Sequence, residues 1–151
     1  MNMQSKTTWV LVADRARARL LELDRGSGRL VEIESHMNPG GRAPDRDAYT
    51  DRAPRVQEAV GSARHAMQPH TSEREKASIR FARELSDMLE RGRSDRRFDQ
   101  LVLIALPQFL GVLRPLLGKP LSRLVVAEIP HEMTTGKLDE IRDCLPVAAV
   151  G

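Results

Sequence analysis

The chain has 151 residues, with 24 basic and 21 acidic side chains and a formal net charge of +3. Its longest uninterrupted apolar run, residues 101–106, is far shorter than the roughly 20 residues that a membrane-spanning helix needs. The single cysteine, Cys144, excludes an internal disulfide and a cysteine-rich zinc site. The sequence therefore predicts one globular domain over residues 1–151 of a cytoplasmic protein, with no membrane association.

The basic residues are mostly arginine, because only four of them are lysines. Arginine binds phosphate and carboxylate groups with a planar pair of N–H donors, so this bias favours an anionic partner. Arginine-biased codons in a GC-rich genome would produce the same composition. The scarcity of aromatic residues argues against a protein that stacks the bases of a single strand on an aromatic surface.

Three strands are predicted at the beginning of the chain. Residues 7–13 are β-branched and apolar, residues 16–24 begin with alternating alanine and arginine, and residues 30–35 alternate apolar with polar side chains. Glycines in the turn 25–28 suit a tight hairpin. Short connections of this kind predict an antiparallel meander.

Residues 38–70 predict a long flexible loop. Proline, glycine and charged residues dominate the segment, and neither a helical nor a strand period persists in it. A connection of this length within a domain is often functional or disordered. We therefore expect this loop to be the least ordered part of the chain.

The second half of the chain alternates helices and strands. Ser72 and Glu75 form the pattern of a capping box before an amphipathic helix that Gly92 ends. The elements predicted after it are a strand at 101–106, a helix that Pro107 begins and that covers 108–117, a strand at 121–129, and a helix capped by Thr134 or Thr135 that runs to about Cys144.

This order predicts an α/β fold with a five-stranded mixed sheet and helices on its faces. The first three strands are antiparallel, and the last two are parallel because a helical crossover joins them. Ribonuclease H-like folds have this order of elements. A nuclease would need clustered carboxylates at the strand ends, but the first strand carries none and Pro107-Gln108 follows the fourth. The sequence thus predicts no catalytic residue, no metal site, no cofactor and no evident small-molecule substrate.

Two sets of residues are candidates for binding phosphate. Arg15, Arg17 and Arg19 share one face if their strand is regular, and would form a phosphate-attracting patch unless that face is simply solvated. Gly40 and Gly41 could cradle a phosphate with their backbone amides, although a plain turn explains the pair equally well.

Four segments resemble the bacterial host attachment family, whose members are described as required for attachment to host cells. They are residues 8–20, 50–55, 103–114 and 128–134. That family is similar in turn to the middle domain of archaeal and eukaryotic peptide-chain release factors. Release factors carry a Gly-Gly-Gln loop before a long helix, and here Gly40, Gly41 and Arg42 stand in a similar place.

The resemblance implies a non-catalytic, release-factor-like module that binds RNA or the ribosome through the predicted loop. Its RNA-facing residues would be Gly40, Gly41 and four arginines, namely Arg42, Arg46, Arg52 and Arg55. Because Arg42 replaces the glutamine, we expect no release of peptide from peptidyl-tRNA, and because the nuclease carboxylates are misplaced, we expect no hydrolysis of RNA. The alternatives are a protein-interaction module that supports attachment to host cells and, third, a metal-dependent hydrolase.

Overall fold

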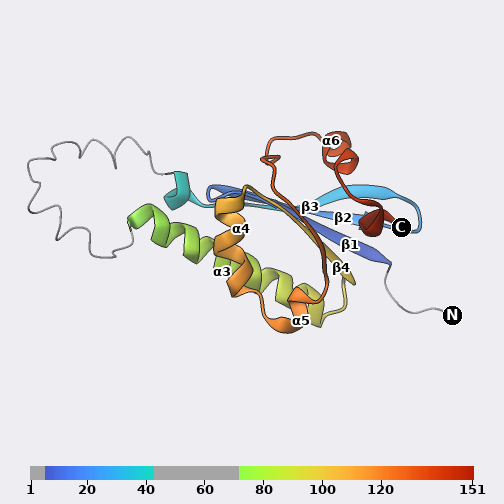
Figure 1. The fold of residues 1–151 in the computed structure, drawn as a ribbon, viewed down its shortest axis with the longest axis horizontal. Helices are drawn as coiled ribbons and strands as arrows, with labels where there is room; N and C mark the ends of the chain where they lie inside the picture. The colour runs from blue at the N-terminus through green and yellow to red at the C-terminus, as the bar shows by residue number, and fades with distance from the viewer. Residues whose placement is uncertain (1–5, 43–71) are drawn as a thin grey trace, which may run out of the picture.

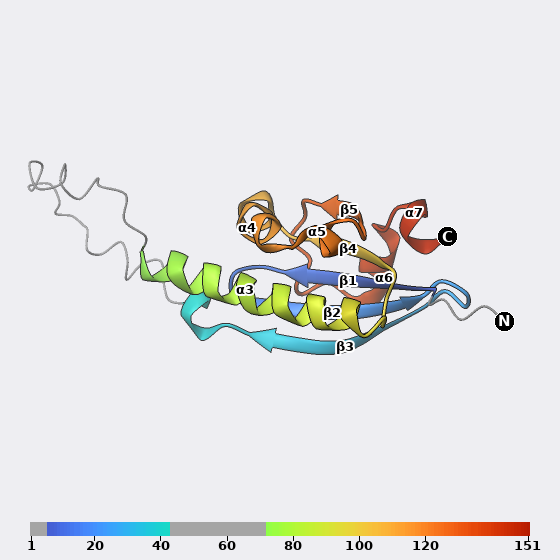
Figure 2. The same cartoon turned by 90° about the horizontal axis from the view of Figure 1, so that it is seen from below.

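The structure is a computed structural model that describes residues 6–42 and 72–151. A five-stranded sheet, in the order β3-β2-β1-β4-β5, carries helices on both faces (Figures 1 and 2). The elements are β1 (Thr7–Ala13), β2 (Arg17–Asp24), β3 (Arg29–Met37), the 3-10 turn η1 (Pro39–Arg42), α3 (Glu73–Ser94), β4 (Gln100–Ile104), α4 (Pro107–Leu113), the 3-10 turn η3 (Arg114–Leu116), α5 (Lys119–Ser122), β5 (Val125–Ile129), α6 (Leu138–Asp143) and α7 (Val147–Val150). Among these described helices, none is both long and apolar enough to cross a bilayer.

The strand directions match the predicted mixed sheet. β1 pairs antiparallel with β2, and β2 pairs antiparallel with β3. On its other side β1 pairs parallel with β4, which pairs parallel with β5. The antiparallel meander and the parallel pair therefore meet at β1, the central strand.

The apolar run in β1 follows from its central position. Trp9 and Leu11 point into a core beneath α3 and α4, whereas Val10 and Val12 point into a second core beneath α6 and α7. Successive side chains of a strand alternate between the two faces, so a strand covered on both faces carries no polar stripe. Figure 1 shows α3, α4 and α5 on one side of the sheet and α6 on the other.

The capping box predicted for the long helix is present. The hydroxyl of Ser72 accepts a hydrogen bond from the Glu75 amide at 3.0 Å, and the Glu75 carboxylate accepts one from the Ser72 amide at 3.1 Å. The buried face of α3 carries the predicted apolar stripe, including Phe81, Leu85 and Leu89. The start of α3 is therefore fixed locally, by its own side chains, as well as by packing.

Two predicted boundaries near the C-terminus are wrong. The fifth strand begins at Val125 and not at 121, because Leu121 lies in α5 and is fully buried against the core beneath α3. The last main helix begins at Leu138, because the hydroxyl of Thr134 is hydrogen-bonded to the Glu132 carboxylate and does not cap a helix.

The beginning of the predicted flexible loop is also wrong. Asn38 is buried, and Pro39–Arg42 forms η1, which packs against α3. The side-chain amide of Asn38 donates to the carbonyl oxygen of Arg15 at 2.7 Å and to that of Ala77 at 3.2 Å. Residues 43–70 of the prediction lie outside the described residues.

An ion pair joins η3 to β5. Arg114 donates from Nε and Nη2 to the two carboxylate oxygens of Glu128, at 3.1 and 2.6 Å. The hydrogen bond from Arg114 holds the pKa of Glu128 below its ordinary value. A carboxyl group whose folded pKa is depressed stabilises the fold above its unfolded pKa and loses that contribution as pH falls through the folded value.

We therefore expect Glu128→Gln to lower the midpoint of thermal unfolding slightly at pH 7. The difference from the unmodified chain should shrink as the pH falls below the unfolded pKa of about 4.3 and through the lower pKa of the folded state, because the carboxylate is then protonated in both states. Thermal unfolding followed by circular dichroism from pH 7 downward checks this. A difference that stayed constant over the range would mean that the pair is not the cause.

Candidate functional site

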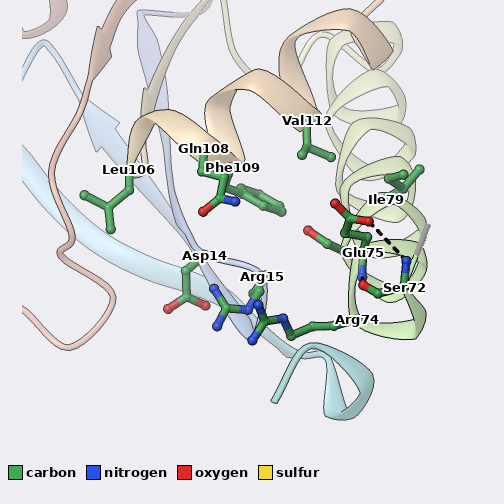
Figure 3. A pocket seen from close by; sticks show the side chains of 11 residues that line it. Asp14, Arg15, Ser72, Arg74, Glu75, Ile79, Leu106, Gln108, Phe109 and Val112 are labelled. Carbon is green, nitrogen blue, oxygen red and sulfur yellow. Dashed lines mark hydrogen bonds between the residues drawn. The ribbon is translucent and has the colours of Figure 1, made fainter. Parts of the chain in front are cut away.

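A cavity of about 510 Å³ opens at the carboxyl ends of the parallel strands β1 and β4 (Figure 3). Ligands of open α/β sheets bind outside the carboxyl ends of parallel strands. The residues around the cavity come from the β1–β2 turn, the first turns of α3 and the start of α4. They are Asp14, Arg15, Ser72, Arg74, Glu75, Ser78, Ile79, Leu106, Gln108, Phe109 and Val112.

The β1–β2 turn is held by Asp14. Its Oδ1 accepts hydrogen bonds from the backbone amides of Ala16 at 2.7 Å and Arg17 at 2.8 Å. An aspartate side chain that binds the amides two and three residues ahead stabilises a tight turn. This turn therefore presents Arg15 to the cavity from a fixed backbone.

The glycine pair in η1 serves close packing. A Cβ on Gly41 would overlap the carbonyl oxygen of Arg15, and a Cβ on Gly40 would lie 2.8 Å from Cβ of Ala77. η1 thus lies directly on the β1–β2 turn and on α3, at a distance that only glycine permits. This contact explains the Gly-Gly sequence without a phosphate, so the predicted backbone cradle has no support in the structure.

The other two walls of the cavity differ in character. α3 contributes Arg74 and Glu75 beside its N-cap, while α4 contributes Gln108 and the ring of Phe109. Figure 3 shows the arginines of the turn and of α3 across the cavity from Gln108 and Phe109. One side is thus charged and the opposite side is mainly apolar.

The three arginines predicted to share an exposed face do not form one. Arg15 precedes β2 and lines the cavity. Arg19 is half-buried because it donates to the backbone oxygens of Thr134 and Gly136, at 3.2 and 2.7 Å, and pairs with Glu32 at 2.9 Å. Arg17 lies at the start of β2 and is also half-buried. The segment before α6 covers Arg19, so this face of β2 is not open to solvent. The prediction of one solvent-facing patch is therefore wrong.

The other predicted site residues fall at the edge of the described part of the chain. Gly40 and Gly41 lie beside the cavity, in η1. The backbone of Arg42 ends η1, and Arg46, Arg52 and Arg55 lie outside the described residues.

A basic row on α3 adjoins the cavity. Lys76, Arg80 and Arg83 are exposed and follow each other at intervals of four and three residues, so they share one face of the helix. Lys76 lies 3.7 Å from the carboxylate of Glu73. Among the described residues, no hydrogen bond or salt bridge involves the side chain of Arg80 or Arg83.

Sequence reasoning noted Pro107-Gln108 only as a position without a carboxylate. The signal that it missed is the topology: because β1 and β4 are parallel, the residues after both strands meet at one edge. Arg74 could not be found this way, because a capping box indicates where a helix starts and not what it faces.

The described residues bring no group of three His, Cys, Asp or Glu side chains together as a metal site. Cys144 lies at the end of α6, where its sulfur is 3.4 Å from Sδ of Met133 and 3.1 Å from the carbonyl oxygen of Ile141. Burial raises the pKa of the Cys144 thiol above its ordinary value. The protonated thiol at neutral pH suits a packing role better than a nucleophilic one.

Solved structures with a similar fold include two large archaeal proteins. One is described as an archaeal protein, at 10% identity and a TM-score of 0.53. The match covers 96% of this chain and 35% of that protein. The other is an archaeal translation termination factor, at 9% identity and a TM-score of 0.55. The match covers 95% of this chain and 36% of that factor. The chain therefore spans about a third of the length of either structure and shares with them a fold. No curated protein matches it.

A family model described as "Protein required for attachment to host cells" matches residues 9–145. The match includes every strand from β2 to β5, the long helix α3 and all residues around the cavity. The chain therefore belongs to the host attachment family, and its fold is similar to part of an archaeal translation termination factor.

Proposed function

We propose that this protein is a non-catalytic, release-factor-like module that binds RNA on the ribosome. The observation that carries the proposal is the pair of exposed arginines, Arg80 and Arg83, on α3 beside η1. Exposed guanidinium groups one helical turn apart suit two neighbouring phosphates, because arginine offers paired N–H donors at a fixed geometry.

Packing of η1 supports the same surface. The ideal Cβ of Gly40 lies 3.7 Å from Nη2 of Arg80, so η1 and this guanidinium are adjacent. In the release-factor resemblance, the Gly-Gly pair belongs to the segment that approaches RNA. The surface proposed to face RNA therefore consists of η1 and the basic row on α3, with Lys76 at one end.

The similarity in fold to the archaeal termination factor supports a role on the ribosome. Its printed description is a translation termination factor, and this chain corresponds to about a third of it. We propose the binding role of such a domain and not the release of peptide, because Arg42 stands where the resemblance places a glutamine.

The test is the dependence of ribosome binding on salt. Each phosphate contact contributes roughly 0.7–0.9 to the slope of log K against log salt, so Arg80→Gln with Arg83→Gln should flatten that slope by about 1.5. Co-sedimentation with purified ribosomes at a series of salt concentrations measures it. Arg29→Gln is the control, since Arg29 is exposed at the β2–β3 hairpin, which lies at the amino end of β1, whereas η1 adjoins the turn at its carboxyl end.

An unchanged slope in the double variant would contradict the proposed surface. Absence of binding by the unmodified chain at low salt would contradict RNA binding as such and favour the protein-interaction role. One observation fits that second role: β5 is an outer strand of the sheet, and Val147 on the adjoining α7 is 82% exposed. An exposed strand edge beside apolar side chains can pair with a strand of another protein.

A further inference from the structure

We propose that the cavity between α3 and α4 binds a single nucleotide, either free or as one unstacked unit of an RNA strand. The volume of about 510 Å³ lies within the range of roughly 300–1,000 Å³ typical of small-molecule sites. The cavity lies at the carboxyl edge of β1 and β4, where ligands of such sheets bind. Its walls offer a matching group for each part of a nucleotide.

The base fits the apolar wall. The α4 side of the cavity is lined by Phe109, Val112 and the preceding Leu106, which is 45% exposed. Unstacked bases recognised by proteins pack against aromatic side chains and are hydrogen-bonded along their edges. Gln108 extends from the first turn of α4 on the same side, and its amide carries both a donor and an acceptor for a base edge (Figure 3).

The phosphate fits the opposite side, where Arg15 and Arg74 line the cavity. A guanidinium has five N–H donors, so an arginine that already has a partner keeps donors for a phosphate. The two arginines come from different elements, the β1–β2 turn and α3, and Asn38, just before η1, joins these elements through hydrogen bonds to the carbonyl oxygens of Arg15 and Ala77. Their separation is therefore set by the fold.

Two carboxylates, those of Asp14 and Glu75, also line the cavity and suit ribose hydroxyls. Oε1 of Glu75 accepts the Ser72 amide, and among the described residues nothing donates to its Oε2. Oδ1 of Asp14 accepts two backbone amides, while its Oδ2 lies 3.4 Å from the hydroxyl oxygen of Thr134. Acidic side chains commonly accept hydrogen bonds from ribose hydroxyls in nucleotide sites.

Simpler ligands leave one side of the cavity unused. An inorganic anion would not contact Phe109 and its apolar neighbours, and an apolar molecule would form no hydrogen bond with the polar side chains of the cavity. A nucleotide uses all of them. A single site also agrees with the scarcity of aromatic residues, because one unit needs one ring and not a stacking surface.

The test measures binding of adenosine 5′-monophosphate and of a six-residue oligoadenylate to the full chain by isothermal titration calorimetry. We expect the mononucleotide to bind with a Kd below about 1 mM. Arg74→Gln and, separately, Gln108→Leu should each weaken binding by about tenfold. Arg29→Gln, at the amino end of β1 and away from the cavity, should leave the Kd unchanged, and NMR shifts on titration should centre on the residues around the cavity.

The two probes distinguish the two sources of the nucleotide. Oligoadenylate that competes with the mononucleotide and binds more tightly supports an RNA strand, and binding of the mononucleotide alone supports a free nucleotide. No binding of either probe at about 5 mM, or equal binding by Arg74→Gln and Gln108→Leu, would overturn the inference. Binding of an RNA strand in the cavity rests on the proposed function, whereas binding of a free nucleotide does not. Ribosome binding that Arg80 and Arg83 control but Arg74→Gln leaves unchanged, with no nucleotide bound, would refute the cavity and retain the proposed function.

Discussion

Replacing Gly41 with alanine should lower the free energy of unfolding by about 3 kcal/mol. The new Cβ would overlap the carbonyl oxygen of Arg15 and lie 2.7 Å from Nδ2 of Asn38. Neither atom can move freely, because that carbonyl accepts the Asn38 amide and Asn38 is buried. η1 must therefore move away from the β1–β2 turn, and the contacts between them are lost.

Urea unfolding of the variant measures this effect. Gly118→Ala is a suitable control, because a Cβ there would meet only Cδ of Pro120, at 3.8 Å, which is an ordinary contact. We expect that control to change stability by no more than about 0.5 kcal/mol. Equal stability of Gly41→Ala and the unmodified chain would mean that η1 does not lie on the turn.

Gly92→Ala should be destabilising by about 2 kcal/mol, although alanine is the better helix former. Gly92 lies in the last turn of α3, where an added Cβ would overlap the six-membered ring of Trp9 and lie 3.1 Å from Phe98. Trp9 cannot yield easily, since it is 1% exposed and stacks on Phe98 with ring centroids 4.4 Å apart. Its indole N–H also donates to the Glu22 carboxylate at 3.1 Å.

The same substitution in α4 should have the opposite sign. A Cβ on Gly111 would meet nothing within 4 Å, so Gly111→Ala should stabilise the protein by about 0.5–1 kcal/mol through helix propensity alone. Thermal unfolding of the two variants side by side separates packing from propensity. Stabilisation by both would show that Trp9 can be displaced at little cost.

Local patterns predicted the elements whose cause is local. The capping box of Ser72 and Glu75 depends on residues three positions apart, and the apolar run of β1 depends on burial of the whole strand. The boundaries that failed depend on distant partners. Leu121 suits a strand or a helix equally well, and only packing against the core beneath α3 decides for α5.

The candidate site was less predictable than the fold for the same reason. Arg19 alternates like an exposed strand residue, but its guanidinium binds backbone oxygens 115 and 117 positions later in the chain. Arg15, Arg74 and Gln108 come together from three elements that are far apart in the sequence. Neither composition nor local spacing predicts which distant residues come together in space. The parallel pairing of β1 with β4 does, because it brings the residues after both strands to one edge.

The central position of β1 has a consequence for how the sheet assembles. Its partners in β2 begin five residues away, at the pair Ala13 and Ala18, whereas Thr8 and Gln100, which pair between β1 and β4, are 92 positions apart. Closing the longer loop costs about 2–3 kcal/mol more in chain entropy. The hairpins of β1, β2 and β3 therefore pair first, also during synthesis on the ribosome, and expose one face of β1 until α3 follows and the other until α6 and α7 follow. This interval is when the nascent chain is most prone to aggregate.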